Sequence, residues 1–287
     1  MKRIHTDPDG AGVGRTHVTR LRSERVEEAD DWLVDEVPVA LVFNGISHAV
    51  MLASPLDLEE FALGFSLTEG LLKDRSELYG VDVVPVTVND AMRGIEVRLE
   101  VASACEFRMK ERRRNLSGRT GCGLCGTESL DQVLRPMPTI DRPLSVETAA
   151  IARALGAMTV QQPLQRLSGA AHAAAWCDRE GQALVVREDV GRHNALDKLI
   201  GAMVQGELAT EAGFIAVTSR ASVEMVQKTL MARVGMLVAV SAPTALAVRI
   251  ADSHGLALAG FARGRDLVCY TYPERFGLMV EPVSGLA

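Results

Sequence analysis

The chain has 287 residues, of which 47% are hydrophobic and 24% are charged, a composition typical of a globular protein that buries a core. Its formal net charge is -6 and its isoelectric point is near 5.6, which argues against a protein that binds nucleic acid by neutralising phosphates. Five irregularly spaced cysteines do not form a disulfide framework, and no apolar run reaches the ~20 residues that span a bilayer. These features predict a cytoplasmic protein that contacts neither nucleic acid nor membrane.

The first part of the chain predicts a flexible tail followed by a β-hairpin. Residues 1–30 mix charge with Gly, Thr and Pro and show no sustained period, so we expect them to be flexible. Two apolar runs, 37–43 and 46–53, then flank Asn44-Gly45. An Asn-Gly pair between two such runs is the strongest short-range signal for a hairpin.

A helix and two further strands are expected after this hairpin. Ser54 is a typical helix cap and is followed by a proline, which predicts a helix over 55–67. Strands are also predicted at 81–88 and at 95–101, where apolar residues alternate with charged ones as in a half-exposed strand. Together these elements predict a small α+β domain over 31–115.

The second half of the chain alternates strands with helices. This alternation predicts a layered α/β domain over 128–287 whose neighbouring strands run parallel. The strands are expected over 172–177, 183–187, 214–218, 236–240, 256–261 and 267–271, and the helices over 145–160, 194–204, 223–234 and 244–254.

Polar clusters follow four of the predicted strands. Ligands of open α/β sheets bind outside the carboxyl ends of the strands, and helix N-termini there favour anions. The pattern therefore suggests an anionic, phosphate-bearing ligand, although caps and turns with solvated arginines explain it as well, and His193 is as consistent with a capping role as with a site role. The clusters cover 188–194, 218–222, 241–244 and 263–266 and contain Arg192, Arg220, Arg263 and Arg265.

Cys122 and Cys125 form a Cys-x-x-Cys motif in which glycines flank both thiols. Because glycine adds no side chain and tolerates unusual backbone angles, the segment 116–127 is predicted to be an exposed loop. Such a loop could bind metal, form a redox pair, or carry a group such as sulfur on a nucleophilic thiol. Arg119 and the basic run at 108–114 would favour the thiolate.

Zinc would need about four ligands, and the motif supplies only two. The signature of zinc deaminases is also missing, because no glutamate stands two residues after His172 and the cysteine pair precedes this histidine. Thioredoxin-like pairs normally open a helix, which Gly123 and Gly126 disfavour. We therefore expect no structural metal and favour a group carrier.

Several long motifs occur in the order found in one known family. Together they make the chain resemble the formate dehydrogenase accessory sulfurtransferase family, FdhD/NarQ, from about Trp32 to its end. The motifs are Ser54–Phe65, Arg119–Gly126, Glu188–Lys198, Ser219–Lys228 and Ser241–Thr244. The sequence departs from many members in carrying Ser219-Arg220-Ala221 where they have Ser-Gly-Arg.

The resemblance implies a fold and a chemistry. The larger domain is expected to be a three-layer α/β domain similar to cytidine deaminases, next to the smaller N-terminal α+β domain. Cys122 would bear sulfur as a persulfide and Cys125 would assist. The implied cofactor-binding residues are Phe261, Ala262, Arg263, Gly264, Arg265 and Asp266, and we add Arg192, His193, Ser219 and Arg220 from the strand-end clusters.

The resemblance also implies the partners. A cysteine desulfurase would supply the sulfur, and the sulfur would pass to the molybdenum cofactor, as bis(molybdopterin guanine dinucleotide) with its GDP-like moieties. The recipient of that cofactor would be the formate dehydrogenase apoenzyme, and the carrier would be a homodimer. The alternative is a non-catalytic chaperone that binds the cofactor for formate dehydrogenase.

Overall fold

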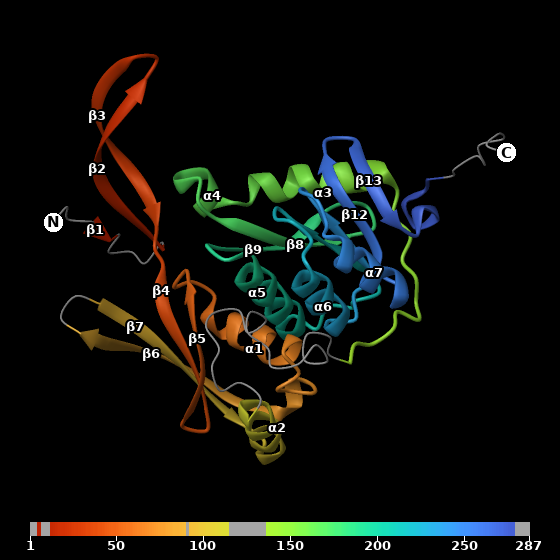
Figure 1. Ribbon diagram of the computed structural model, residues 1–287, viewed down its shortest axis with the longest axis horizontal. Helices are drawn as coiled ribbons and strands as arrows, with labels where there is room; N and C mark the ends of the chain where they lie inside the picture. The colour runs from red at the N-terminus through yellow and green to blue at the C-terminus, as the bar shows by residue number, and fades with distance from the viewer. Residues whose placement is uncertain (1–4, 7–11, 90–91, 115–135, 279–287) are drawn as a thin grey trace. The chain divides into compact units, whose positions relative to one another are not determined.

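The structure is a computed structural model that describes residues 5–6, 12–89, 92–114 and 136–278 (Figure 1). The chain divides into two compact units. The first contains Met1–Pro136, Gln162–His172 and Arg187–Ala202, and the second contains Met137–Gln161, Ala173–Val186 and Met203–Ala287. These units differ from the expected domains at 31–115 and 128–287, because two segments from the second half of the chain belong to the first unit.

The first unit contains a four-stranded sheet with the strand order β5-β4-β7-β6. Strands β4 and β7 are parallel, whereas β4–β5 and β6–β7 are antiparallel pairs. Asn44 and Gly45 join β4 to β5 with φ angles of 45° and 80°, the left-handed values of a tight hairpin turn, which confirms the predicted hairpin. The bounds are Val37–Phe43 (β4), Ile46–Ala53 (β5), Leu78–Asn89 (β6) and Met92–Val101 (β7).

Helix α1 (Leu58–Thr68) contacts β6 and β7. It begins three residues later than expected, because Asp57 adopts a left-handed conformation with φ of 53°. Ser54 is therefore not the helix cap, and its fully buried side chain has other partners, described below. A short 3-10 turn (Arg75–Glu77) and the helix α2 (Ser103–Arg114) complete this part of the chain.

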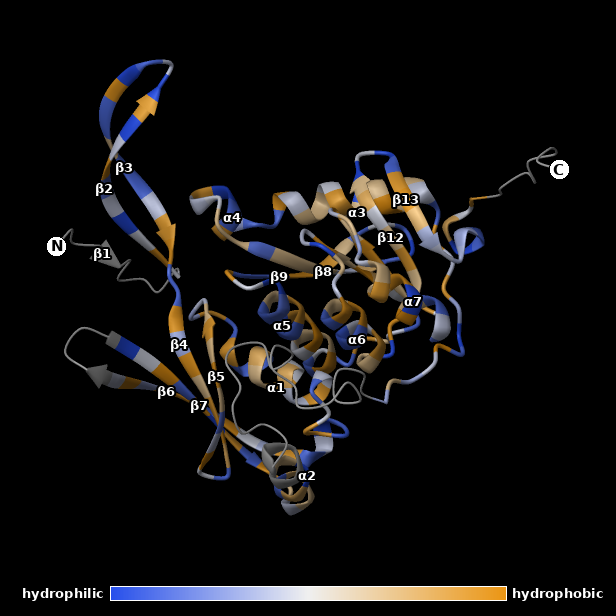
Figure 2. Cartoon of the chain, viewed as in Figure 1, coloured by the Kyte–Doolittle hydropathy of each residue, from blue (hydrophilic) through white to orange (hydrophobic). Residues whose placement is uncertain are grey.

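The N-terminal region contains a long hairpin where a flexible tail was expected. Strands β2 (Val13–Arg22) and β3 (Arg25–Val34) pair along ten residues each, and β1 (His5–Thr6) adds to β2. Salt bridges join the two strands, including Arg15–Asp30 at 2.5 Å and Arg20–Asp31 at 3.3 Å. The hairpin therefore depends on cross-strand charge pairs; β4 and β5, by contrast, are predominantly hydrophobic (Figure 2).

Two helices cross closely in the first unit. A Cβ atom on Gly64 of α1 would lie 1.8 Å from the carbonyl oxygen of Asp197, and one on Gly201 would lie 1.9 Å from that of Glu60. Asp197 and Gly201 belong to α5 (Arg192–Gln205). Only glycine permits this backbone approach, and it explains why residues 192–202 belong to the first unit.

A carboxylate ties a second late segment to the first unit. Glu188 accepts hydrogen bonds from the backbone amides of Leu164 and Gln165, both at 2.8 Å. These residues open the short helix α4 (Pro163–Ser168), which also contacts β3. The sequence analysis did not predict α4.

The second unit is built on a six-stranded sheet with the order β13-β12-β11-β10-β8-β9. The three central strands β10, β11 and β12 are parallel as expected, but β8 and β13 run antiparallel to their neighbours, so the sheet is mixed. The bounds are His172–Asp178 (β8), Ala183–Asp189 (β9), Gly213–Val217 (β10), Met236–Ala239 (β11), Ala257–Arg263 (β12) and Asp266–Thr271 (β13).

Helices flank this sheet. Helix α3 (Thr148–Val160) packs on one face and helices α6 (Val223–Met231) and α7 (Ala245–Ser253) lie on the other (Figure 1). Alternate strand residues such as Phe214, Ala216 and Val238 are fully buried in one hydrophobic cluster with α3. A 3-10 turn (Pro273–Phe276) follows β13. The chain is thus a mixed α/β protein.

Candidate functional site

The loops that follow β10 and β11 meet the last residues of β12 at one edge of the sheet in the second unit. The amide of Ser241 donates to the carbonyl of Ser219 at 3.4 Å, and the amide of Phe261 donates to the carbonyl of Ser241 at 3.2 Å. Ala221 and Pro243 form an isolated parallel bridge. The polar clusters predicted after β10 and β11 therefore lie together and next to Phe261 of β12, as expected from the carboxyl ends of parallel strands; the third cluster, 263–266, forms the turn that follows.

Three guanidinium groups extend from these loops. Arg220, Arg263 and Arg265 are exposed, and none of them has an ion pair or a hydrogen-bonded side-chain partner among the described residues. Arg263 and Asp266 are opposite residues in the β12–β13 register and close a tight turn, in which Gly264 has a φ of 57°. Exposed, unpaired guanidinium groups at a strand-end edge are suited to binding phosphate.

Two implied residues precede this turn and differ in exposure. Phe261 adopts a left-handed φ of 51° within an irregularity of the β12–β13 pairing, and its side chain is 48% exposed. Ala262 is buried at 1%. The aromatic ring therefore faces outward, whereas the neighbouring methyl group packs into the core.

The N-terminus of α6 lacks the usual side-chain cap. Ser222 occupies the cap position without a side-chain hydrogen bond to the helix, and its buried hydroxyl has no hydrogen-bond partner in the part of the chain that the structure describes. In contrast, Thr244 caps α7 by accepting from the amide of Ala247 at 3.3 Å. A helix start with an unused hydroxyl offers spare hydrogen-bonding capacity to an anion.

Arg192 and His193 lie at the start of α5, in the first unit. The buried Nε of Arg192 has no hydrogen-bond partner within the described ranges. Burial lowers the pKa of the nearby His172, and the positive charge of Arg192 lowers it further. Ser219 and Arg220, by contrast, belong to the second unit.

A buried polar cluster supports the turn before Arg192. The ammonium group of Lys198 lies 2.7 Å from Asp189 Oδ2 and donates to Ser54 Oγ at 2.7 Å. Asp189 Oδ1 accepts from the amide of Gly191 at 2.8 Å and from Asn194 Nδ2 at 2.9 Å. Lys198, Asp189 and Ser54 are all 0% exposed, so this cluster fixes the backbone that presents Arg192.

No sequence pattern predicts this cluster. Its members come from two distant parts of the chain, Ser54 and the segment 189–198, and sequence spacing alone does not show which charged side chains are buried. One signal was available: Asn194, Lys198 and Gly201 recur at helical spacing and so share one face of α5.

Cys122 and Cys125 lie outside the described residues, so their predicted roles remain predictions. The cysteines that the structure describes have poorly reactive surroundings. Burial raises the pKa of the Cys177 thiol to about 12 and that of Cys269 to about 11. The pKa of Cys105 is also raised, mainly by desolvation.

The basic segment before the cysteine motif begins with a residue that has a structural role. Arg108 donates to the carbonyl oxygen of Leu71 at 2.9 Å and forms a salt bridge with Glu77.

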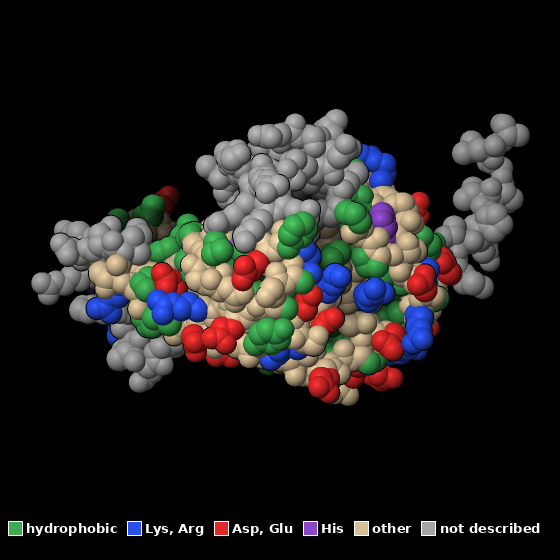
Figure 3. All heavy atoms as spheres, turned by 90° about the horizontal axis from the view of Figure 1, so that it is seen from below, with side chains coloured by type: hydrophobic (Ala, Val, Ile, Leu, Met, Phe, Trp, Pro, Cys, Tyr) green, Lys and Arg blue, Asp and Glu red, His purple; other side chains and the backbone are tan. Residues whose placement is uncertain are grey.

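On the face drawn in Figure 3, acidic and basic side chains are interspersed. Within the described ranges, no three His, Cys, Asp or Glu side chains gather as a metal site, and no helix there is long and apolar enough to cross a membrane.

Known proteins resemble the chain over nearly its whole length. A sulfur carrier protein FdhD from Variovorax paradoxus is 57% identical over 258 residues, which cover 90% of this chain and 91% of the relative. Another, from Bordetella petrii, is 49% identical over 276 residues, which cover 96% of this chain and 98% of the relative.

A solved structure has the same fold. It is described as a formate dehydrogenase accessory protein from Desulfotalea psychrophila and matches with a TM-score of 0.69 at 21% identity, over 91% of this chain and 98% of that one. The family model described as the FdhD/NarQ family matches residues 34–277. The chain therefore belongs to the FdhD/NarQ family.

Proposed function

We propose that the protein is a sulfur carrier that delivers sulfur to the molybdenum cofactor required by formate dehydrogenase. The observation that carries this proposal is the 57% identity, over 90% of the chain, to a protein named sulfur carrier protein FdhD. The glycine-flanked pair Cys122 and Cys125 supplies the chemistry that such a carrier needs, since a thiolate can accept and release sulfur.

The first transfer loads Cys122. Its thiolate attacks the outer sulfur of a persulfide on a cysteine desulfurase. The sulfur–sulfur bond of the donor breaks, the donor cysteine leaves as a thiolate, and a new sulfur–sulfur bond forms on Cys122. The step exchanges one disulfide-type bond for another and needs no oxidant.

The second transfer uses Cys125. Its thiolate attacks the inner sulfur, Cys122 Sγ, and the outer sulfur leaves as hydrosulfide, which becomes available to the molybdenum. The two cysteines supply the two electrons and finish as a disulfide, which a dithiol reductant must return to thiols. The same pair of residues thus accounts for both the loading and the release of sulfur.

The cofactor is a client whose guanine dinucleotide carries phosphates. In the second unit, the strand-end edge offers the guanidinium groups of Arg220, Arg263 and Arg265 together with the unused hydroxyl of Ser222. The exposed ring of Phe261 provides an aromatic face on which a base can stack.

The remaining predicted site residues contribute in two ways. Ser219, Ala262, Gly264 and Asp266 shape the backbone of the strand-end edge. In the first unit, Arg192 and His193 at the N-terminus of α5 offer a separate position for an anionic group.

Intact mass spectrometry tests the carrier function. The purified chain is incubated with a cysteine desulfurase and cysteine, and we expect a gain of one sulfur atom that peptide mapping places on Cys122. The Cys122→Ala variant should gain none. In the Cys125→Ala variant, Cys122 should load but should release hydrosulfide more slowly. Sulfur mapped only to other cysteines would contradict the proposal.

A non-catalytic chaperone of the cofactor is the alternative function. The open cation-rich edge of the second unit is compatible with binding alone. Formate dehydrogenase activity in cells that express only Cys122→Ala separates the two functions, because a chaperone would still support the enzyme and a carrier would not.

Three further aspects belong to the same proposal. Helices on both faces of the second-unit sheet support the three-layer arrangement of cytidine deaminases, which superposition of an experimental structure on a deaminase would test. We also propose a homodimer, measurable by light scattering, and a cytoplasmic location, measurable by cell fractionation.

A further inference from the structure

The four-stranded sheet of the first unit has one face that no described helix covers. Its other face carries the buried side chains of Leu41, Val97 and Leu99 beneath α1. Because successive strand residues point to opposite faces, the intervening residues Arg98 and Glu100 face away from α1 and are exposed. We call this second face the outer face.

The outer face has an apolar half. In the register of the sheet, one row of side chains across all four strands runs Val50, Ala40, Glu96, Val84, and the next runs Ser47, Val42, Arg98, Asp82. The β5 and β4 ends of these rows are mostly apolar. Val50 is 60% exposed, and Leu52 on the same strand is 57% exposed.

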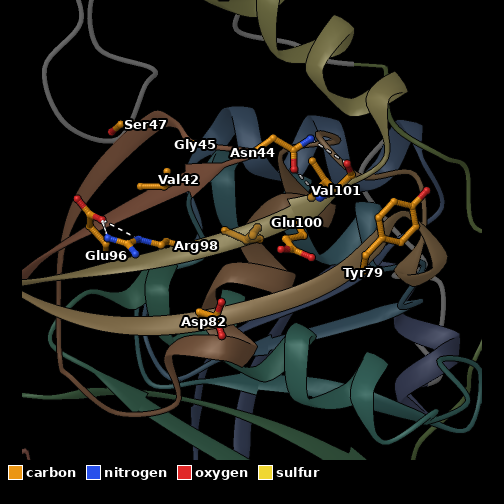
Figure 4. Close-up of a pocket in the computed structure, with 11 residues that line it drawn as sticks. Val42, Asn44, Gly45, Ser47, Tyr79, Asp82, Glu96, Arg98, Glu100 and Val101 are labelled. Atoms are coloured by element: carbon orange, nitrogen blue, oxygen red, sulfur yellow. Dashed lines mark hydrogen bonds and ion pairs between the residues drawn. The ribbon is translucent and has the colours of Figure 1, made fainter.

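The other half of the outer face is acidic. Arg98 is paired with Glu96, donating from Nε at 2.9 Å and from Nη2 at 2.7 Å to the same carboxylate oxygen (Figure 4). This pairing neutralises both groups. Asp82 and Glu100 have no ion pair or hydrogen bond among the described residues, so two uncompensated negative charges remain along β6 and β7.

The face is also hollowed where the two halves meet. A cavity of about 770 Å³ is lined by residues that include Val42, Tyr79, Asp82, Arg98 and Glu100 (Figure 4). The apolar row at Val50 and Leu52 extends along the strands beyond this hollow. A small cationic ligand would fill the hollow but would leave the row uncovered, so an extended partner fits the surface better.

We propose that the outer face is a docking surface for a partner protein that presents an amphipathic helix with lysines or arginines along one flank. The apolar stripe of such a helix would cover the exposed side chains of Val50 and Leu52, and its cations would reach Asp82 and Glu100. Nucleic acid and anionic lipid surfaces are excluded as occupants because both carboxylates would repel their phosphates. This inference is independent of the sulfur chemistry.

Binding of a synthetic helical peptide tests the proposal. The probe is a fluorescent peptide with Leu on one face and Lys on the adjoining flank, and a second peptide has Glu in place of each Lys. At low salt, the Asp82→Asn/Glu100→Gln variant should bind the Lys peptide about 5- to 10-fold more weakly, as expected for two exposed charge pairs. The Glu peptide should bind neither protein.

The apolar half is tested with a matched pair of variants. The Val50→Thr/Leu52→Thr variant places β-branched side chains, which suit a strand, at both positions and should also weaken binding by about 5-fold, through lost apolar contact. Glu180→Gln/Asp252→Asn removes the same two negative charges from exposed positions of the second unit and should change affinity by less than about twofold.

Hydrogen exchange locates the bound peptide. Protection should appear on β4, β5, β6 and β7 of the wild-type protein. Equal weakening by the control variant, equal binding of the Glu peptide, or protection confined to the second unit would overturn the proposal. The Cys122→Ala variant should bind the Lys peptide as the wild type does, which keeps this test separate from that of the carrier function.

Discussion

Two polar regions of the molecule differ in how much hydrogen-bonding capacity they leave unused. Around Lys198 and Asp189 in the first unit, the side chains are 0% exposed and their charged atoms are bonded to one another or to Ser54. At the strand-end edge of the second unit, Arg220 and Arg263 are exposed without ion pairs among the described residues. Among the same described residues, the hydroxyl of Ser222 has no hydrogen-bond partner.

This difference separates architecture from binding. A buried, fully bonded cluster has nothing left to offer a ligand, and its removal is expected to destabilise the fold. An exposed edge with unpaired cations adds little to stability but can bind an anion. The two regions should therefore respond to mutation in opposite ways, one in stability and the other in affinity.

The largest expected effect is on the buried cluster. Lys198→Met leaves the Asp189 carboxylate buried without its counter-charge, which should lower the free energy of unfolding by about 3 to 5 kcal/mol. Urea denaturation followed by circular dichroism measures this. As a control, Lys73→Met at an exposed position should stay within about 0.5 kcal/mol. An unchanged denaturation midpoint for Lys198→Met would show that the cluster is dispensable.

The next largest effect on stability is expected where helices α1 and α5 cross. Gly64→Ala places a methyl group against the carbonyl of Asp197, and overpacking of this kind should cost about 1 to 3 kcal/mol or more. The same substitution at Gly156, an exposed position of α3 with nothing within 4 Å, should stabilise the protein by about 0.5 to 1 kcal/mol. Thermal melting of both variants compares the two, and equal melting temperatures would refute the close crossing.

The N-termini of α6 and α7 in the second unit allow a capping hydroxyl to be compared with one that caps nothing. Thr244→Ala removes the cap of α7 and should cost about 1 kcal/mol of stability. Ser222→Ala removes a hydroxyl that caps nothing and should cost less than about 0.5 kcal/mol, while weakening GDP binding. Melting curves with and without GDP separate these outcomes. A loss of stability equal to that of Thr244→Ala would mean that Ser222 serves as a structural cap.

The unpaired cations should matter for affinity alone. Arg263→Ala should weaken GDP binding about 5-fold, corresponding to about 1 kcal/mol for one charged contact, with an unchanged melting temperature. Calorimetric titration measures the affinity. Arg249→Ala removes an exposed arginine from α7 and is the matched control. Equal weakening by both substitutions would point to long-range charge effects and would argue against a site at this turn.

The smallest expected effect is the pH response of the N-terminal hairpin. Hydrogen bonds to Asp30 and Glu28 raise the pKa of His17 above its usual 6.5. The stabilisation of the hairpin by the protonated His17 side chain is therefore complete below pH 6.5 and is lost as the pH rises through the higher pKa that His17 has in the folded state. Hydrogen exchange of the hairpin amides, corrected for intrinsic rates, should show this loss. His17→Gln should abolish this pH-dependent change in exchange, and a change that persists in the variant would have to come from another titrating group.

The success of sequence-based prediction depended on how local the determining interaction was. The turn at Asn44 and Gly45 needs left-handed backbone that these residues supply themselves, so the hairpin was predictable. The hairpin of β2 and β3 turns at Ser23 and Glu24, whose φ angles are 45° and 68°. These residues give no turn signal, and cross-strand charge pairs stabilise its strands without an apolar alternation.

The candidate site was predictable in part for the same reason. The loops at Ser219 and Ser241 meet each other and Phe261 of β12 because parallel strands bring their carboxyl ends to one edge, which the alternating pattern implies. The contacts of Ser54 with Asp189 and Lys198 join segments more than a hundred residues apart. Such contacts follow from tertiary packing and leave no local pattern in the sequence.

The burial of the described cysteines has a practical consequence for chemical labelling. An alkylating reagent reacts with the thiolate, and the raised pKa values of Cys105, Cys177 and Cys269 keep these three groups protonated at neutral pH. Brief treatment of the native protein with iodoacetamide should leave them almost unmodified. Background labelling of these three cysteines is thus low. The label that the native chain acquires therefore reports on Cys122 and Cys125, and the other cysteines need not be removed by mutation.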